Sequence, residues 1–442
     1  MTADWYMAYG GVEVANHARL GVYLQTVGSP LTSAGACGCP TVGAEQLGDL
    51  PYTTPDDADS PAPWYDPDVP ESTDFAGIMV LEMSGIDDFP VRRNVTGGII
   101  GGGSIGPARA LPRTITVTAL VLGATCCGVE YGLHWLGEVL QGCTGSACDG
   151  DCLTLYSCCP GEEDLTPEQF NAEHRRTLRR VALVDGPNVV ARSGTGCATG
   201  DCQSGADIIT VEFVLTAAMP WLWTDTTPVL EVAPPGDDST DCIDWCVHAP
   251  DGPGCDGPCR FAPCPDPTAA CADPRCAPPP PPTPTLPSET CYCLPVAVER
   301  ECYDLDLTDR PAWSTDAPMI TVRAGSSDLR NLTLEIFERA AGDEALTPGE
   351  VADLYRCTPY SAFHVTYVPA GGALTLDGQV GRATVECGGV CESSPDVYGR
   401  EGLPPTWRTL GCASYVICLT SDVSNPPSPS AMVSVGVSGR GR

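Results

Sequence analysis

The first 230 residues alternate short apolar runs with clusters of Gly, Pro, Asp and Ser, a pattern typical of β-strands joined by turns. Residues 5–9 and 12–14 flank Gly10 and Gly11, a pair that readily adopts the positive φ of a two-residue turn, so the chain is expected to begin with a β-hairpin. The β pattern continues over 20–24. Further strands are expected over 76–83, 114–122, 181–184 and 208–215.

Helical patterning is confined to two segments of this region. Apolar residues recur at helical spacing from Val129 on, which predicts an amphipathic helix over 129–141 with one face on a sheet. Thr166 offers a capping oxygen ahead of Pro167, whose preset φ suits the first turn. A helix or turn is therefore expected to begin here and to end before residue 181.

Two segments carry turn residues in place of periodicity. Residues 29–74 are dense in Pro, Asp, Gly and Ser, so a long exposed loop is expected there. The last six residues of 97–106 formally match the dinucleotide fingerprint, which requires a following helix. Pro107 and Pro112 follow instead, so a plain mobile loop is predicted.

Periodicity stops at 231–300 and returns beyond it. The intervening segment has nine cysteines and a proline run over 278–282 but almost no apolar residues, so it is expected to be an extended linker or a small crosslinked segment. Seven short strands then predict an antiparallel β-sandwich, over 319–323, 332–337, 363–367, 373–376, 381–387, 414–420 and 432–437.

The expected fold is mainly β with few short helices. An α+β domain is assigned to 1–230, a Cys/Pro-rich segment to 231–300 and an all-β sandwich to 301–442.

The charge of the chain excludes several function classes. The 57 acidic residues outnumber 23 basic ones, all of them arginine, and the formal net charge is -34. Phosphate-loop hydrolases, protein kinases and Schiff-base enzymes need a lysine, and this chain has none. Stable binding to duplex DNA or to anionic membranes needs basic surface, so neither is expected. The sequence also has no visible secretory signal and no run of 18 apolar residues, so a soluble protein assembled in the cytoplasm is expected.

Cysteine is unusually frequent for such a chain, with 26 residues. In the Cys/Pro-rich segment the cysteine spacing is compatible with disulfides, with free thiols or with a metal site. The paired C-x2-C motifs of a zinc ribbon are absent from its sequence. Weak metal candidates are Cys242, Cys246, Cys255 and Cys259. Candidate disulfide cysteines are Cys242, Cys246, Cys255, Cys259, Cys264, Cys271, Cys276, Cys291 and Cys293. A second cluster, from Cys126 to Cys159 with His134 nearby, suits bridges from a loop to its helix at least as well as a metal.

No catalytic constellation is recognisable. The five histidines are scattered, and neither a G-x-S-x-G elbow nor an H-E-x-x-H helix occurs. Acid pairs such as Asp56-Asp57 fall in loops, where solvated turns are expected and calcium is the alternative. Catalytic residues, a cofactor and a resident metal are therefore not predicted.

One basic stripe stands out in this acidic chain. It is either a contact with the carboxylates of a neighbouring subunit or an ordinary exposed helix face, and it consists of Arg175, Arg176, Arg179 and Arg180.

Several stretches resemble the minor tail proteins of tailed phages that infect actinobacteria, of the siphophage distal tail type. They are the opening motif over 12–19, the Asp185-Gly186-Pro187 turn with its flanking strands, the Pro220-Trp221-Leu222 run, and the stretch over 364–378. The resemblance covers 1–230 and about 315–437, and neither the loop at 29–74 nor the Cys/Pro-rich segment has a counterpart in it.

The resemblance implies a structural virion protein at the tail tip, without enzymatic activity. Identical copies would form a ring, six being the expected number, below the tail tube and beside the tape measure and other tail-tip proteins. Genome DNA passes such a ring without sticking if acidic residues line the channel. Long loops and strand edges supply ring contacts, and the loop at 29–74 is the candidate arm.

Two other classes of function remain open. The carboxyl-terminal sandwich could bind a host glycan through exposed aromatic residues such as Trp313, Tyr360 and Trp407. A tail-associated cell-wall hydrolase would instead use a pair of carboxylates on that sandwich.

Overall fold

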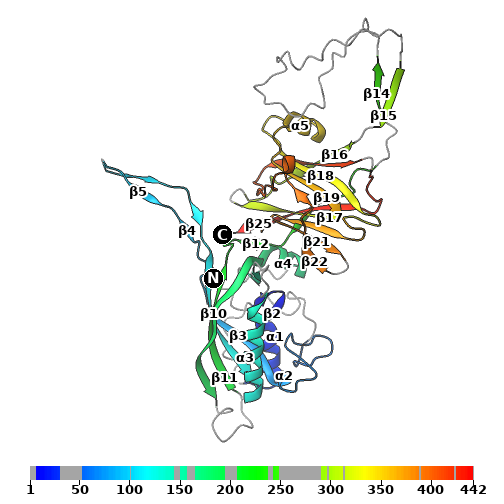
Figure 1. Ribbon diagram of the computed structural model, residues 1–442. Helices are drawn as coiled ribbons and strands as arrows, with labels where there is room; N and C mark the ends of the chain where they lie inside the picture. Colours follow the sequence, from blue (N-terminus) through cyan, green and yellow to red (C-terminus); the bar gives the residue numbers. More distant parts are fainter. Residues whose placement is uncertain are drawn as a thin grey trace. The chain divides into compact units, whose positions relative to one another are not determined.

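The computed structural model describes residues 6–29, 52–99, 101–143, 150–156, 165–194, 207–236, 242–247, 290–295, 298–311, 314–387, 390–422 and 425–441. Its contacts divide the chain into two compact units, Met1–Thr227 with Ser438–Arg442, and Pro228–Val437. Both units are built mainly of antiparallel strands, as Figure 1 shows, which confirms the predicted fold class.

The first unit opens with the expected hairpin and then departs from prediction. Strand β1 (Tyr6–Tyr9) pairs with β2 (Val12–Asn16). Residues 20–24 form part of helix α1 (His17–Thr26), not a strand. The Asn16 side chain accepts a hydrogen bond from the backbone N–H of Arg19 and caps the helix, and Leu20, Tyr23 and Leu24 form its buried face. Their spacing of three and four is helical, so the strand prediction was wrong.

A four-stranded antiparallel sheet forms the centre of this unit. In spatial order it contains β3 (Phe75–Ser84), β8 (Arg113–Gly123), β11 (Asp207–Ala217) and β10 (Arg175–Gly194). The first part of β10 also pairs with β9 (Asp151–Tyr156) and β12 (Leu222–Thr224). The last residues of the chain return to this unit, because Gly441 pairs with Leu222 of β12.

Two helices begin directly after capping threonines. Helix α3 (Cys126–Gln141) starts after Thr125, which accepts from the N–H of Gly128, and it packs on one face of the sheet (Figure 1). The predicted 129–141 helix is therefore confirmed with an earlier start. Helix α4 (Pro167–His174) has a complete capping box at Thr166 and stops directly before β10.

The glycine-rich segment forms a ribbon, not a loop without structure. Strand β4 (Val91–Arg92) pairs with β7 (Arg109–Ala110), and β5 (Val95–Gly97) pairs with β6 (Gly103–Ile105). The ribbon connects the end of β3 to the start of β8 and extends away from the sheet in Figure 1. The mobile loop expected at 97–106 was wrong because short strands without a buried face have no hydrophobic periodicity.

The described part of the predicted loop at 29–74 packs on the core of the first unit. Trp64 is buried, and its indole N–H donates to the Phe75 carbonyl at 3.0 Å, while the Tyr131 hydroxyl donates to the Trp64 carbonyl at 2.6 Å. The segment ends in the short helix α2 (Glu71–Asp74). Residues 52–74 are therefore not a projecting arm, whereas 30–51 lie outside the described residues.

The second unit is a sandwich of two sheets, as the sequence predicts. One sheet has the order β16 (Val298–Asp306), β24 (Ser414–Asp422), β18 (Leu329–Glu338), β19 (Ser361–Val368) and β23 (Val397–Tyr398). The other has β25 (Met432–Gly441), β17 (Thr315–Arg323), β20 (Ala373–Asp377), β21 (Arg382–Cys387) and β22 (Val390–Ser393), with β13 (Thr227–Val232) beside β25. Apolar side chains from both sheets form one buried cluster.

Two smaller elements complete the second unit. Helix α5 (Pro348–Tyr355) begins with a capping box at Thr347 and packs through Val351 and Ala352 on the outer face of the first of these sheets. Strands β14 (Cys242–Val247) and β15 (Thr290–Pro295) form a separate two-stranded ladder. Residues 248–289 lie outside the described part of the chain. Among the described helices, none has the length and apolar character needed to cross a membrane.

Helix α3 approaches the sheet so closely that Gly132 has no room for a side chain. A Cβ atom there would lie 2.3 Å from the Phe75 ring, whereas a Cβ at Gly137 on the same helix would meet nothing within 4 Å. We expect Gly132→Ala to lower the free energy of unfolding by about 1–3 kcal/mol through overpacking. Gly137→Ala should instead raise it by up to about 1 kcal/mol through helix propensity. Thermal unfolding of both full-length variants measures the difference, and equal shifts would contradict this close packing.

Candidate functional site

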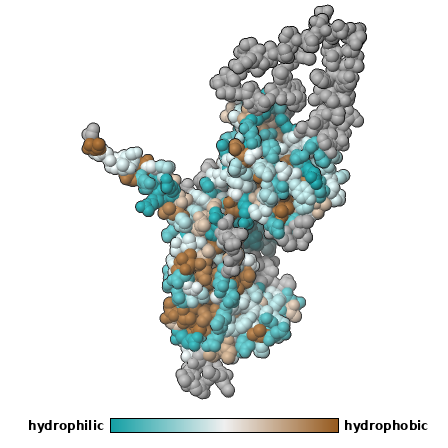
Figure 2. Space-filling view, viewed as in Figure 1, coloured by the Kyte–Doolittle hydropathy of each residue, from teal (hydrophilic) through white to brown (hydrophobic). Residues whose placement is uncertain are grey.

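The four-stranded sheet of the first unit is covered by α3 on one face, whereas on its other face Tyr23 and Leu24 of α1 line a pocket with Leu122 and Ile208 at one end of the strands. Its inward positions, such as Val117, Val211 and Phe213, are fully buried against α3 and the rest of the core. The alternate positions of β8 point to the other side, the open face, and are occupied by threonines, Leu120 and the buried Leu122. Figure 2 shows apolar side chains gathered on the first unit beside polar ones in this region.

Strand register places carboxylates together on the open face. Glu82 pairs with Thr118, Thr118 with Glu212, and Glu212 with Asn188, so these four residues form one row across the sheet. In the next row Asp185 of β10 lies opposite Val214.

No outward-facing paired position of these four described strands is an arginine. Arg113 points inward, is buried, and donates to the carbonyls of Pro220 and Ile86. Arg192 pairs with Ile209, an inward-facing residue, and its Nε lies 3.9 Å from the Asp207 carboxylate. This open face therefore carries carboxylates and hydroxyl groups at one end and apolar side chains such as Met79, Leu120 and Ile208 at the other.

Neither lateral edge of this sheet has a further ladder partner within the described residues, although β2 and α1 lie beside β3 and the His17 side chain is hydrogen-bonded to the Val80 backbone. Strand β3 has β8 as its only ladder partner, and β10 beyond Leu183 pairs only with β11. The open part of β10 also exposes the side chains of Val184, Val189 and Val190. Unpaired strand edges are sites where another chain can add its own strand.

The predicted arginine stripe lies on β10 and not on a helix, because α4 ends at His174. Arg175 forms an ion pair with Asp225, with its Nη2 at 2.7 Å from the carboxylate, and Arg176 donates to the Arg175 carbonyl at 2.8 Å. Arg179 donates to the Cys152 sulfur at 3.2 Å. The helix-face interpretation is therefore wrong, whereas an inter-subunit contact of these residues stays a prediction.

Several described cysteines form disulfides, among them two of the Cys126–Cys159 cluster and others outside every predicted set. Cys302 and Cys418 are bonded across the directly paired positions of β16 and β24. Cys126, Cys143 and Cys357 are also disulfide-bonded, whereas Cys127, Cys152 and Cys412 are free thiols.

Only part of the predicted cysteine set falls on described backbone. Of the nine candidates, Cys242, Cys246, Cys291 and Cys293 lie on β14 and β15, where the backbone of Cys246 pairs with that of Cys291. Cys255, Cys259, Cys264, Cys271 and Cys276 lie outside the described residues, so their pairing stays a prediction. Within the described parts of the chain, no group of His, Cys, Asp or Glu side chains is arranged to hold a metal ion.

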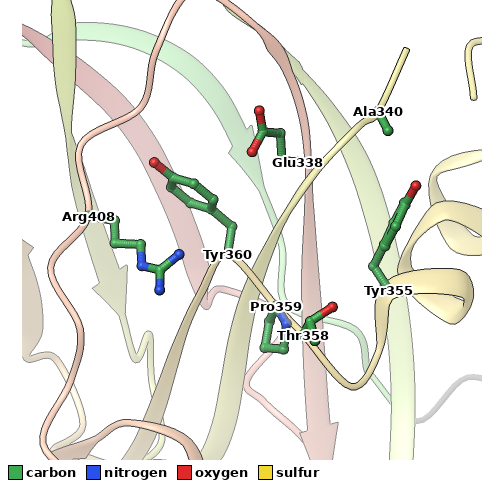
Figure 3. A pocket seen from close by; sticks show the side chains of 7 residues that line it. All are labelled: Glu338, Ala340, Tyr355, Thr358, Pro359, Tyr360 and Arg408. Atoms are coloured by element: carbon green, nitrogen blue, oxygen red, sulfur yellow. The ribbon is translucent and has the colours of Figure 1, made fainter. Parts of the chain in front are cut away.

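A cavity of about 530 Å³ opens in the second unit beside the carboxyl end of α5. Figure 3 shows Tyr360 at its centre, with Arg408 and Glu338 on either side and Tyr355 across from them on α5. The Arg408 guanidinium lies 5.2 Å from the centre of the Tyr360 ring. The lining therefore combines aromatic faces with one positive and one negative side chain.

The two phenol groups of this pocket are held in place by hydrogen bonds. Tyr360 donates to the Thr409 carbonyl at 2.7 Å, and Tyr355 donates to the Asp343 carboxylate at 2.7 Å. Burial and the nearby Glu338 charge raise the pKa of Tyr360, and the hydrogen bond to Asp343 raises the pKa of Tyr355. Both phenols stay protonated at neutral pH, and their rings are fixed for contact with a ligand.

Of the three aromatic residues predicted to bind glycan, only Tyr360 lines this pocket. Trp407 is half-buried against Phe363, with ring centres 5.1 Å apart. Trp313 lies outside the described residues. Sequence reasoning missed Glu338, Tyr355 and Arg408 because they come from separate segments, and it missed the acidic rows of the open face because these depend on strand register.

Comparisons with known proteins give no matching family model and no matching curated protein. Among solved structures, the chain is similar to the Dit protein of phage SPP1, described as a paradigm of the hub adsorption apparatus in phages that infect Gram-positive bacteria. That match has 10% identity and a TM-score of 0.33, and it covers 83% of this chain and 95% of the other. A second match is the activated baseplate of phage p2, with 8% identity, a TM-score of 0.39, and coverage of 82% and 90%. Both structural neighbours are phage tail proteins.

Proposed function

We propose that this protein is a structural component of a phage tail tip, where identical copies form a ring around a channel for DNA. The observation that carries the proposal is the four-stranded sheet, whose face away from α3 carries Glu82, Glu212 and Asp185 and whose edge strands have no further ladder partner within the described residues. The sequence resemblance to distal tail proteins supports the same role. The ring joins the tail tube to the distal tip, next to the tape measure and other tail-tip proteins, in the virion.

The two open edges of the sheet suit a contact that repeats around a ring. Strand β3 lies at one edge and the distal half of β10 at the other, so an edge of one copy can pair with the opposite edge of the next. Such a contact is heterologous. The assembly has no unpaired strand edges only if successive copies close into a ring. The exposed Val184, Val189 and Val190 add apolar area to the joint.

The charge of the open face suits a channel through which DNA passes. If the faces of all copies line the bore, Glu82, Glu212 and Asp185 present rings of carboxylates to the phosphates. Arginines at these positions would instead release counterions and hold the duplex. The proposed channel therefore lets DNA move without adhesion.

A second candidate function is the binding of a host glycan in the Tyr360 pocket. The fixed rings of Tyr355 and Tyr360 offer surfaces for a sugar, and Glu338, Thr358 and Arg408 offer hydrogen-bonding groups. Most glycoside hydrolases use two carboxylates that flank the scissile bond. The lining of this pocket contributes one, which favours binding over hydrolysis.

The ring is tested by the mass and symmetry of the purified full-length protein. We expect a closed oligomer, with six copies of the 46.2 kDa chain, and rings in negatively stained images. A chain that stays monomeric at every concentration, and in isolated tail tips, would contradict the proposal.

The charge of the bore is tested by the double variant Glu82→Arg/Glu212→Arg. We expect the oligomeric variant to retain duplex DNA in a filter-binding assay at low salt and to release it as salt rises, whereas the wild type retains none. Glu130→Arg/Glu138→Arg, on exposed positions of α3, is the control with the same change in charge. Equal retention by the two variants would show that the open face does not line the bore.

The glycan site is tested by binding of the full-length protein to a panel of bacterial cell-wall polysaccharides. We expect Tyr355→Ala and Arg408→Ala each to weaken binding by about tenfold, as loss of an aromatic or charged contact does. Tyr398→Ala, an exposed tyrosine of the same unit outside the pocket, should leave binding unchanged. Binding that none of the three variants alters would place the glycan site elsewhere.

A further inference from the structure

The ribbon formed by β4 to β7 carries apolar side chains that have nothing to pack against within the described chain. Val95, Ile99 and Ile105 have 70%, 104% and 67% of their surface exposed. Because they stand on a narrow two-stranded ribbon, they cannot form a core of their own. Exposed apolar side chains grouped in this way mark a surface that another protein covers.

The ribbon is also basic. Residues 89–112 contain Arg92, Arg93 and Arg109 and no acidic residue, although the whole chain has a net charge of -34. Arg93 donates to the Gly106 carbonyl across the ribbon at 3.2 Å, and Arg92 and Arg109 are exposed. A positive ribbon on a strongly negative protein is attracted to other copies of that protein.

A surface of opposite charge lies on the same unit. Residues 52–74 contain seven acidic residues and no arginine. Asp57, Asp66 and Asp74 accept hydrogen bonds from groups of the chain, whereas the side chains of Asp56, Asp59, Asp68 and Glu71 are exposed. We call residues 52–74 the acidic segment. Since Trp64 and Tyr131 fasten it to the core, it presents these carboxylates from a fixed position.

The ribbon and the acidic segment are connected to opposite ends of strand β3. The acidic segment leads into Phe75, the first residue of β3, and the ribbon follows Ser84, the last. At about 3.3 Å per residue the ten-residue strand separates these points by about 30 Å. One copy therefore presents the two charges at different places, as a head-to-tail contact between copies requires.

From these observations we propose that the ribbon of one copy docks on the acidic segment of the neighbouring copy. This inference rests on the proposed ring and assigns the contact that ties each member to the next. The arginines of the ribbon face the exposed carboxylates of the segment, and the apolar side chains of the ribbon are covered by the neighbour.

Charge exchange between two variants of the full-length protein tests this contact. The first variant is Arg92→Glu/Arg93→Glu/Arg109→Glu, and the second is Asp59→Arg/Asp68→Arg/Glu71→Arg. Each alone places like charges at the contact, so we expect the apparent dissociation constant of the oligomer to rise at least about tenfold. An equimolar mixture should assemble again, because every contact between unlike variants joins opposite charges. The mixed ring alternates the two chains and therefore has an even number of copies.

The control variant for the second triple is Glu130→Arg/Asp309→Arg/Glu392→Arg, which makes the same change in charge at exposed positions elsewhere. It should assemble like the wild type. Native mass spectrometry follows each protein and the mixture, and circular dichroism verifies that all of them fold.

The possible outcomes separate this inference from the proposed function. If the wild type and both triple variants all form rings, the ribbon contact is overturned and the proposed ring stands. Loss of assembly by each variant without recovery in the mixture would overturn the acidic segment as the acceptor and point to another tail protein. A monomeric wild type would overturn both the ring and this contact.

Discussion

A β-sheet that is packed on one side only must expose its other side and its unpaired edges to water or to another chain. This constraint governs the first unit. Helix α3 fills one side of the sheet so tightly that Gly132 has no space for a side chain. The opposite side carries threonines and carboxylates, which tolerate water, beside apolar side chains such as Leu120 and Ile208. The same sheet is therefore stable in the free protein and open to neighbours at β3 and β10.

Exposed arginines are unevenly distributed in this acidic protein, so its surfaces differ in charge. Several arginines are used inside the units, such as Arg19 beside Glu13, Arg310 beside the buried Asp316, and Arg113, which binds backbone carbonyls. Because these arginines are paired inside the units, they add little positive charge to the surface. The ribbon keeps three arginines at its surface, so its potential opposes that of the surrounding chain.

Elements with strong local signals were predictable from the sequence, and those that depend on tertiary register were not. Alternation in β8, helical spacing in α3 and the capping threonine of α4 each act within a few residues, and all three elements were found. Helix α1 was missed because its buried face spans less than two turns. The row through Glu82 and Glu212 depends on a bulge between Val80 and Glu82, which no local pattern reveals. The pocket around Tyr360 likewise draws its lining from distant segments.

The polypeptide passes twice between the two units. The polypeptide leaves the first unit after Thr227 and re-enters it at Ser438, where the end of β25 pairs with β12. The second unit is thus inserted into the first and tethered at both of its ends. The backbone therefore enters and leaves the second unit through two separate covalent connections, so that cutting either one would still leave it joined to the first.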